Sequence, residues 1–210
     1  MIFASRQDAG RKLAQFLVQR KTAADLVMGL PRGGVVVAAQ VAHELKLPLD
    51  VLVVRKIGHP LQREFAVGAL AEPDFVFINE QSLREFPAAP SELDRVIAEE
   101  KQRLHEYRRH FHLREMASSE RKNILLVDDG LATGATAEAA AVSLRRQNVK
   151  RIIIAAPVAS LESVARLRRV ADEVEILSTD PAFTAVGQFY RQFSQVTDEE
   201  VIALLKEQHA

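Results

Sequence analysis

Residues 123–156 combine two short apolar runs with an alanine-rich segment between them. Residues 123–127 read NILLV and residues 151–156 read RIIIAA, and such runs are typical of strands that are buried on both faces. Residues 135–147 are long enough to form a helix. Parallel neighbouring strands need a crossover connection of this kind, so the unit predicts two parallel strands with a covering helix. We therefore expect an α/β fold with a central, mostly parallel sheet flanked by helices.

The rest of the chain continues the alternation of strands and helices. We expect strands at residues 25–30, 49–54, 75–78 and 174–177, and helices at residues 5–20, 33–45, 91–115, 161–170 and 198–208. Residues 55–68 interrupt the pattern with two glycines, a proline and mixed charges, which predicts an irregular loop with a function. The 210 residues suffice for a single domain, 1–210. We expect its core at about 22–178 and a small hood formed by the chain ends, including about 179–196.

Composition excludes several classes of function. Lysine plus arginine and aspartate plus glutamate number 28 each, so the zero net charge indicates no binding of nucleic acid or of an anionic membrane. The chain has no cysteine, which excludes disulfides, thiol nucleophiles and zinc sites with sulfur ligands. Its first residues resemble neither a signal peptide nor a spanning segment, and we expect a cytoplasmic protein.

The turn after the strand at residues 123–127 carries the clearest functional signal. Thr133 and Gly134 bring small residues to the start of the next helix, where free amides and the helix dipole favour a phosphate. Asp128 and Asp129 come just before this turn and would repel a second phosphate, but they suit sugar hydroxyl groups as hydrogen-bond acceptors. A phosphate beside a vicinal diol describes a ribose 5-phosphate. The alternative is an ordinary strand–turn–helix corner with capping aspartates.

The sequence LLVDDGLATGAT in this turn resembles the signature of type I phosphoribosyltransferases, which bind 5-phosphoribosyl-1-pyrophosphate (PRPP). The LAT element is most similar to the adenine-type enzymes, and the resemblance extends over about residues 26–157. It implies that the 5'-phosphate is bound by Ala132, Thr133, Gly134, Ala135 and Thr136. It also implies that Asp128 and Asp129 face the ribose hydroxyls and stabilise positive charge that develops at C1.

A second glycine-rich turn, at Pro31, Arg32, Gly33 and Gly34, follows the strand expected at residues 25–30. Two glycines at a helix start expose amides to an anion, and the guanidinium group of Arg32 adds a bidentate donor. The turn resembles the pyrophosphate loop of the same family, which implies a cis peptide bond before Arg32. The alternative is a plain proline–glycine turn.

The interruption at residues 55–68 resembles the flexible catalytic loop of these enzymes. The resemblance implies that Arg55 and Lys56 neutralise the leaving pyrophosphate and that closure of the loop excludes water. The hypoxanthine- and guanine-type enzymes carry an aspartate at the position of Ala132, and this chain lacks it. Glu64 or Glu72 could supply that carboxylate.

The resemblance implies transfer of the phosphoribosyl group of PRPP to a nitrogenous base, with Mg²⁺ on the substrate oxygens, no direct protein ligand to the metal, and a homodimer. Phe183, Phe189 and Tyr190 are candidates to stack on the acceptor base, which the sequence does not identify. A small satellite core is an equal reading of these aromatic residues. Two other functions stay open: a regulatory protein that senses PRPP without turnover, and a hydrolase, for which no nucleophile–base pair is evident.

Overall fold

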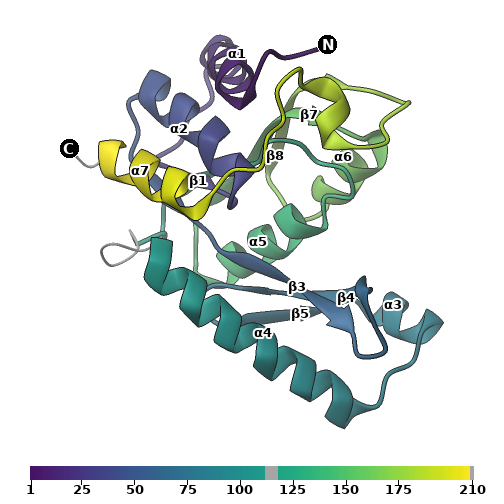
Figure 1. The fold of residues 1–210 in the computed structure, drawn as a ribbon. Coiled ribbons are helices and arrows are strands. Elements are labelled where there is room, and N and C mark those ends of the chain that lie inside the picture. Colours follow the sequence, from purple (N-terminus) through teal and green to yellow (C-terminus); the bar gives the residue numbers. More distant parts are fainter. Residues whose placement is uncertain (112–117, 209–210) are drawn as a thin grey trace.

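The computed structural model describes residues 1–111 and 118–208, and its centre is a five-stranded parallel sheet (Figure 1). The strands lie in the order β2-β1-β6-β7-β8, and every neighbouring pair is parallel. Their bounds are Leu26–Gly29 (β1), Leu49–Val51 (β2), Asn123–Val127 (β6), Arg151–Ala159 (β7) and Glu173–Thr179 (β8). The predicted α/β class and the central parallel sheet are confirmed.

Helices cover both faces of this sheet. Their bounds are Arg6–Gln19 (α1), Gly33–Leu45 (α2), Ala135–Arg146 (α5), Leu161–Leu167 (α6) and Asp198–Gln208 (α7). Alternate residues of each strand enter opposite cores: Leu125 and Val127 of β6 pack with α1 and α2, whereas Ile124 and Leu126 pack with α5 and α6. This period of two explains why the strands are continuously apolar, since each of their faces is covered by helices.

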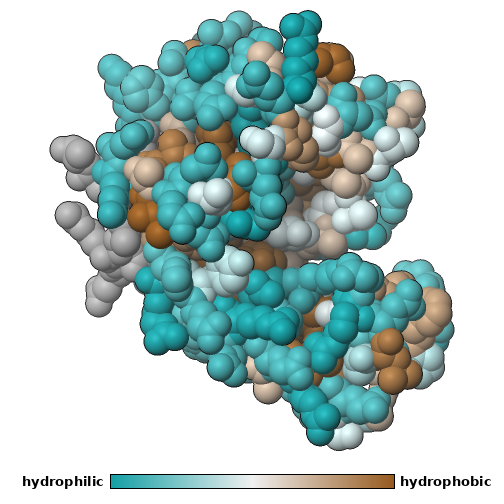
Figure 2. Space-filling view, viewed as in Figure 1, coloured by the Kyte–Doolittle hydropathy of each residue, from teal (hydrophilic) through white to brown (hydrophobic). Residues whose placement is uncertain are grey.

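A second, three-stranded antiparallel sheet lies apart from the central one and packs on a long helix, in the lower part of Figure 1. It consists of Val54–His59 (β3), Gln62–Ala71 (β4) and Phe75–Ile78 (β5), followed by Glu80–Glu85 (α3) and Pro90–Phe111 (α4). Figure 2 shows a mostly hydrophilic surface on this side of the molecule, with a recess between the two parts.

The expected irregular loop at residues 55–68 is therefore wrong. These residues form most of the β3–β4 hairpin, in which Arg55 pairs with Leu70 and Ile57 with Gly68. The pairing shifts at Gly58, where the ladder becomes irregular, and this shift hid the strand alternation in the sequence. The predicted end of the long helix at residue 115 lies outside the described residues.

The start of the chain meets the segment around Tyr190 near the carboxyl end of β7. Phe3 forms a bridge to Tyr190, and both pack with Phe189 and Val158 in a small hydrophobic cluster. A single turn of 3-10 helix, Val186–Phe189, precedes this point, and α7 then packs on α2. In the described part of the chain, no helix is long and apolar enough to cross a membrane.

Candidate active site

The turn between β6 and α5 forms a small phosphate-sized cavity. Gly134 adopts φ +72° just before the helix begins, a conformation that glycine tolerates best. The cavity has a volume of about 150 Å³ and is lined by Asp128 and residues 130–137. Because the first amides of a helix have no partner within the helix, this loop can donate several hydrogen bonds to a phosphate. The five residues predicted to bind the 5'-phosphate thus line one cavity.

Two serines at the start of the neighbouring α6, the N-cap Ser160 and Ser163, hold this loop in place. Ser160 Oγ donates to the carbonyl oxygen of Ala132 at 2.7 Å, and Ser163 Oγ donates to that of Leu131 at 2.9 Å. Leu131 also forms a bridge to Ala159 at the end of β7. The loop is therefore fixed from both sides before any ligand arrives, which lowers the entropy that binding must overcome.

The two adjacent aspartates face different parts of the site. Asp128 lines the phosphate cavity, and its Oδ1 accepts a hydrogen bond of 2.8 Å from the amide of Asp129. Asp129 instead accepts a hydrogen bond from Nε of Arg6, at 2.7 Å between Nε and Oδ2. Tyr190 donates its hydroxyl proton to the carbonyl oxygen of Asp129 at 2.6 Å. The two carboxyls that are predicted to face the ribose hydroxyls thus have different partners within the protein.

Electrostatics at this pair follow from burial and proximity. Burial raises the pKa of the Asp128 carboxyl well above its ordinary value, and the neighbouring Asp129 carboxylate raises it further. Burial also raises the pKa of Asp129, while the hydrogen bond and charge of Arg6 oppose that rise. Burial and mutual repulsion thus oppose ionisation of both carboxyls, and Arg6 partly offsets this effect at Asp129.

The loop at residues 31–34 lies directly against the acidic pair. A Cβ atom added at Gly33 would meet the carboxylate of Asp129, and one added at Gly34 would lie 2.9 Å from Cα of Asp128. Both glycines are thus needed for close approach of the two loops. The peptide bond between Pro31 and Arg32 is cis, as the family resemblance implied. Arg32 Nη1 lies 3.7 Å from Oδ1 of Asp198 in α7.

Arg55 and Lys56 contact glutamates of the second sheet and of α4. Nε of Arg55 lies 2.7 Å from Oε2 of the buried Glu100, and its guanidinium lies 5.2 Å from the ring centre of Tyr107. Lys56 Nζ donates to the carbonyl oxygen of Glu64 at 3.1 Å and lies 3.3 Å from its Oε2, and 47% of the Lys56 side chain is exposed. Arg55 is therefore held by a buried carboxylate, whereas the partner of Lys56 is an exposed one.

Glu64 and Glu72, the two candidates for the carboxylate missing at Ala132, differ in surroundings. Glu64 projects from the hairpin with 94% of its side chain exposed. Glu72 is fully buried, where it accepts a hydrogen bond from the amide of Val53 and lies 3.6 Å from Nε of Arg108. Glu72 thus joins the end of β4 to α4 and to the segment between β2 and β3. Ala132 itself is exposed at the tip of the phosphate loop.

The hood aromatics form the small satellite core that the sequence left open. Phe189 and Tyr190 are 3% and 6% exposed, and Phe183 packs against Phe189 with ring centres 5.0 Å apart. Phe193, which the sequence did not single out, is 39% exposed and stacks on Tyr190 at 5.1 Å. Val186 of the same segment touches Gly130, so this core forms a roof over the acidic turn.

Within residues 1–111 and 118–208, no group of three or more histidine, aspartate or glutamate side chains could enclose a metal ion. The donors at the site are instead carboxylate oxygens of two adjacent residues, which suit a hard cation only in company with other oxygen ligands. Two carboxylates do not enclose a magnesium ion, so the oxygens of a polyphosphate ligand would have to hold it.

The sequence of this chain is similar to a known protein family and to several known proteins. A family model described as the phosphoribosyl transferase domain matches residues 2–194. The chain belongs to the phosphoribosyl transferase domain family. Two curated proteins of Mycobacterium tuberculosis, both bearing the provisional name phosphoribosyl transferase, are 42% identical over 212 residues. The match covers 99% of this chain and 47% of theirs, so the chain spans about half the length of these phosphoribosyl transferase relatives.

Solved structures share this fold. The protein TT1426 of Thermus thermophilus is 43% identical, with a TM-score of 0.83 and coverage of 99% of both chains. A purine phosphoribosyltransferase of Pyrococcus horikoshii is 16% identical, with a TM-score of 0.50 and coverage of 93% of this chain and 97% of its own. The latter likeness concerns the fold alone.

Several residues of the site were not found from the sequence. Each of them forms a hydrogen bond or an ion pair with a residue that is distant along the chain. These residues are Arg6, Ser160, Ser163 and Glu100, and Arg6 lies 123 positions from its partner Asp129. A cationic residue at the start of an amphipathic helix looks like any solvated charge. No local pattern in the sequence could have distinguished it.

Proposed function

We propose that this chain transfers the 5-phosphoribosyl group of PRPP to a nitrogenous base and releases pyrophosphate. The observation that carries the proposal is the meeting of three parts at one edge of the sheet. The phosphate cavity, Asp128, which is one of its lining residues, and the glycine loop at residues 31–34 adjoin one another. In this order, the three parts would bind the 5'-phosphate, the ribose hydroxyls and the pyrophosphate of PRPP.

In the proposed reaction a nitrogen atom of the base forms a bond to C1 of the ribose as the bond from C1 to the pyrophosphate oxygen breaks. The electron pair of the broken bond leaves with the pyrophosphate, and the base nitrogen later loses its proton. Positive charge develops at C1 in between. A carboxylate at Asp128 stabilises this charge, and a low-dielectric surrounding strengthens that effect.

Positive groups near the glycine loop would receive the leaving pyrophosphate. Arg32 can turn from Asp198, because the two lie 3.7 Å apart and each side chain is about one-third exposed. Lys56 on the β3–β4 hairpin can exchange its exposed contact with Glu64 for a phosphate oxygen. When bound, Mg²⁺ would supply charge neutralisation on the pyrophosphate and ribose oxygens, with no direct protein ligand.

Calorimetry with PRPP and Mg²⁺, followed by a panel of purine and pyrimidine bases assayed for pyrophosphate release, tests the proposal. Asp128→Asn should bind PRPP more weakly and lose turnover, whereas Glu162→Gln, at an exposed carboxylate of α6, should leave both unchanged. Absence of PRPP binding to the unaltered protein would reject the proposed function. Binding without turnover on any base would instead identify a PRPP sensor.

A further inference from the structure

The hydroxyl of Tyr190 connects the segment that covers the acidic turn with the backbone of that turn. It donates to the carbonyl oxygen of Asp129 at 2.6 Å. The ring is buried and packs against Phe3 and Phe193, with ring centres 5.6 Å and 5.1 Å away. The ring thus belongs to the small hydrophobic cluster, and the hydroxyl is the group of Tyr190 that meets the acidic turn.

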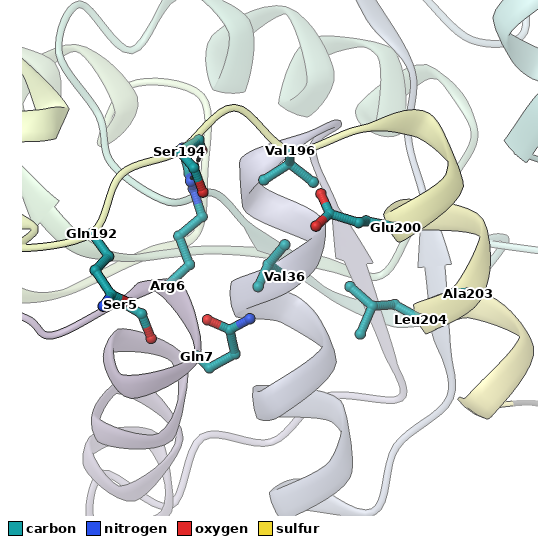
Figure 3. Close-up of a pocket in the computed structure, with 10 residues that line it drawn as sticks. All are labelled: Ser5, Arg6, Gln7, Val36, Gln192, Ser194, Val196, Glu200, Ala203 and Leu204. Atoms are coloured by element: carbon teal, nitrogen blue, oxygen red, sulfur yellow. Dashed lines mark hydrogen bonds between the residues drawn. The ribbon is translucent and has the colours of Figure 1, made fainter.

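The backbone around Tyr190 is held by the start of the chain. Tyr190 forms a bridge to Phe3, whose carbonyl oxygen accepts a hydrogen bond of 2.8 Å from the amide of Arg191. Nη1 of Arg6 donates to the carbonyl oxygen of Ser194 at 2.8 Å. Figure 3 shows these two residues together at a cavity of about 350 Å³ that both line. The Tyr190 hydroxyl is therefore held in position before a ligand binds.

This hydroxyl determines the direction of one peptide group in the turn. The peptide bond between Asp129 and Gly130 is trans. Because a trans peptide group is planar, its C=O and N–H bonds point in opposite directions. The carbonyl oxygen of Asp129 is turned toward Tyr190, so the N–H group of Gly130 is turned away from it.

The amide of Gly130 is left for a ligand. The neighbouring amides of Asp129 and Leu131 donate to Oδ1 of Asp128 and to the carbonyl oxygen of Val158. In the described part of the chain, the amide of Gly130 has no such acceptor. Gly130 is buried and is one of the residues that line the phosphate cavity. Since buried backbone N–H groups are nearly always paired, this one indicates an acceptor that the ligand brings.

We propose that Tyr190 is a positioning residue that orients the peptide group after Asp129, so that the amide of Gly130 donates to an oxygen of the bound phosphoribosyl group. The inference rests on the proposed function, since PRPP is the ligand that supplies this oxygen. It adds a main-chain donor to the site. It also gives Tyr190 a role that needs the hydroxyl and no stacking on the acceptor base.

The sequence allows this single peptide group to be observed by nuclear magnetic resonance. Aspartate is followed by glycine only at Asp129 and Gly130. Protein made by cell-free synthesis with carbonyl-¹³C aspartate and ¹⁵N glycine therefore gives one signal in a carbonyl–amide correlation spectrum. Hydrogen bonding moves the carbonyl carbon of an acceptor and the amide proton of a donor downfield. PRPP with Mg²⁺ should move the Gly130 amide proton downfield, and Tyr190→Phe should move the Asp129 carbonyl carbon of the empty protein upfield.

Calorimetry with PRPP and Mg²⁺ measures the effect on affinity. Tyr190→Phe keeps the ring and removes the hydroxyl, so binding should weaken about three- to ten-fold, the range of a lost neutral hydrogen bond. Tyr107→Phe is the matched control and should bind as the unaltered protein does. Tyr107 is the other tyrosine of the chain, and its hydroxyl has no hydrogen-bond partner within residues 1–111 and 118–208.

The signal at saturating PRPP separates positioning from a merely structural role. In Tyr190→Phe the Gly130 amide proton should move less than in the unaltered protein, although both sites are filled. A residue that only supports the fold would lower affinity and leave the saturated signal unchanged. Circular dichroism would check that both variants are folded.

A Gly130 amide proton that does not move when the unaltered protein binds PRPP would overturn the proposal without any variant. Equal affinity of Tyr190→Phe and the unaltered protein, or equal signals at saturation, would overturn the role of Tyr190. Failure of the unaltered protein to bind PRPP would instead reject the proposed function.

Discussion

Replacement of Asp128 by asparagine should make the empty protein more stable while it removes function. Asparagine keeps an oxygen that can accept the 2.8 Å bond from the amide of Asp129 but carries no charge. Burial and the charge of Asp129 raise the pKa of Asp128, so ionisation of this carboxyl at neutral pH destabilises the folded state. Because each pKa unit corresponds to about 1.4 kcal/mol, we expect the free energy of unfolding to rise on the order of 1 kcal/mol or more.

The pH dependence of this gain has a definite sign. A carboxyl with a raised pKa in the folded state contributes its full stability below the unfolded value, near 3.8, and loses it as the pH rises through the folded value. Urea unfolding should therefore give similar free energies for Asp128→Asn and the unaltered protein near pH 4. The variant should become the more stable one as the pH rises to 8.

Asp172 provides a control of opposite sign. It accepts hydrogen bonds from the amide of Ile152 at 2.7 Å and from Arg145 at 2.8 Å, and these contacts lower its pKa. Asp172→Asn should destabilise the protein at neutral pH, with a difference that disappears as the pH falls below about 4. If Asp128→Asn followed the same trend as Asp172→Asn, or showed no change between pH 5 and 8, the reasoning from burial would be refuted.

Four further variants test the supports of the site. Gly34→Ala would place Cβ 2.9 Å from backbone atoms of Asp128 and Val127, so urea unfolding should show a loss of about 1–3 kcal/mol, and calorimetry weaker PRPP binding. Ser163→Ala leaves the carbonyl of Leu131 without its hydroxyl donor, and should cost about 1 kcal/mol of stability and weaken binding of inorganic phosphate; unchanged binding would contradict a prearranged loop. Arg55→Ala leaves the buried Glu100 without one cation and should lower the thermal midpoint, whereas Lys56→Ala should slow pyrophosphate release at an unchanged midpoint.

Local sequence patterns were sufficient to predict most of the central sheet. The strand at Asn123–Val127 and the helix at Gly33–Leu45 have the predicted bounds, because continuous apolar runs and terminal glycines depend on neighbouring residues only. The predicted phosphate residues line one cavity for the same reason, since a strand, a turn and a helix start are contiguous in the chain.

The hairpin at residues 54–71 could not be predicted in this way. Its strands are irregularly paired, and its outer strand β3 rests on α4, some forty residues further along the chain. The pairing that satisfies its backbone and the contact that covers it are both tertiary, so glycines and mixed charges in the sequence looked like a loop.

The sequence alone determined the kind of fold and the presence of a phosphate turn followed by a helix. Only the tertiary structure decided that Asp128 lines the cavity while Asp129 contacts Arg6. It also decided that Arg55 forms an ion pair with Glu100. The reason is physical: the direction and charge of a buried side chain depend on what packs against it. Those neighbours come from parts of the chain that are brought together by folding.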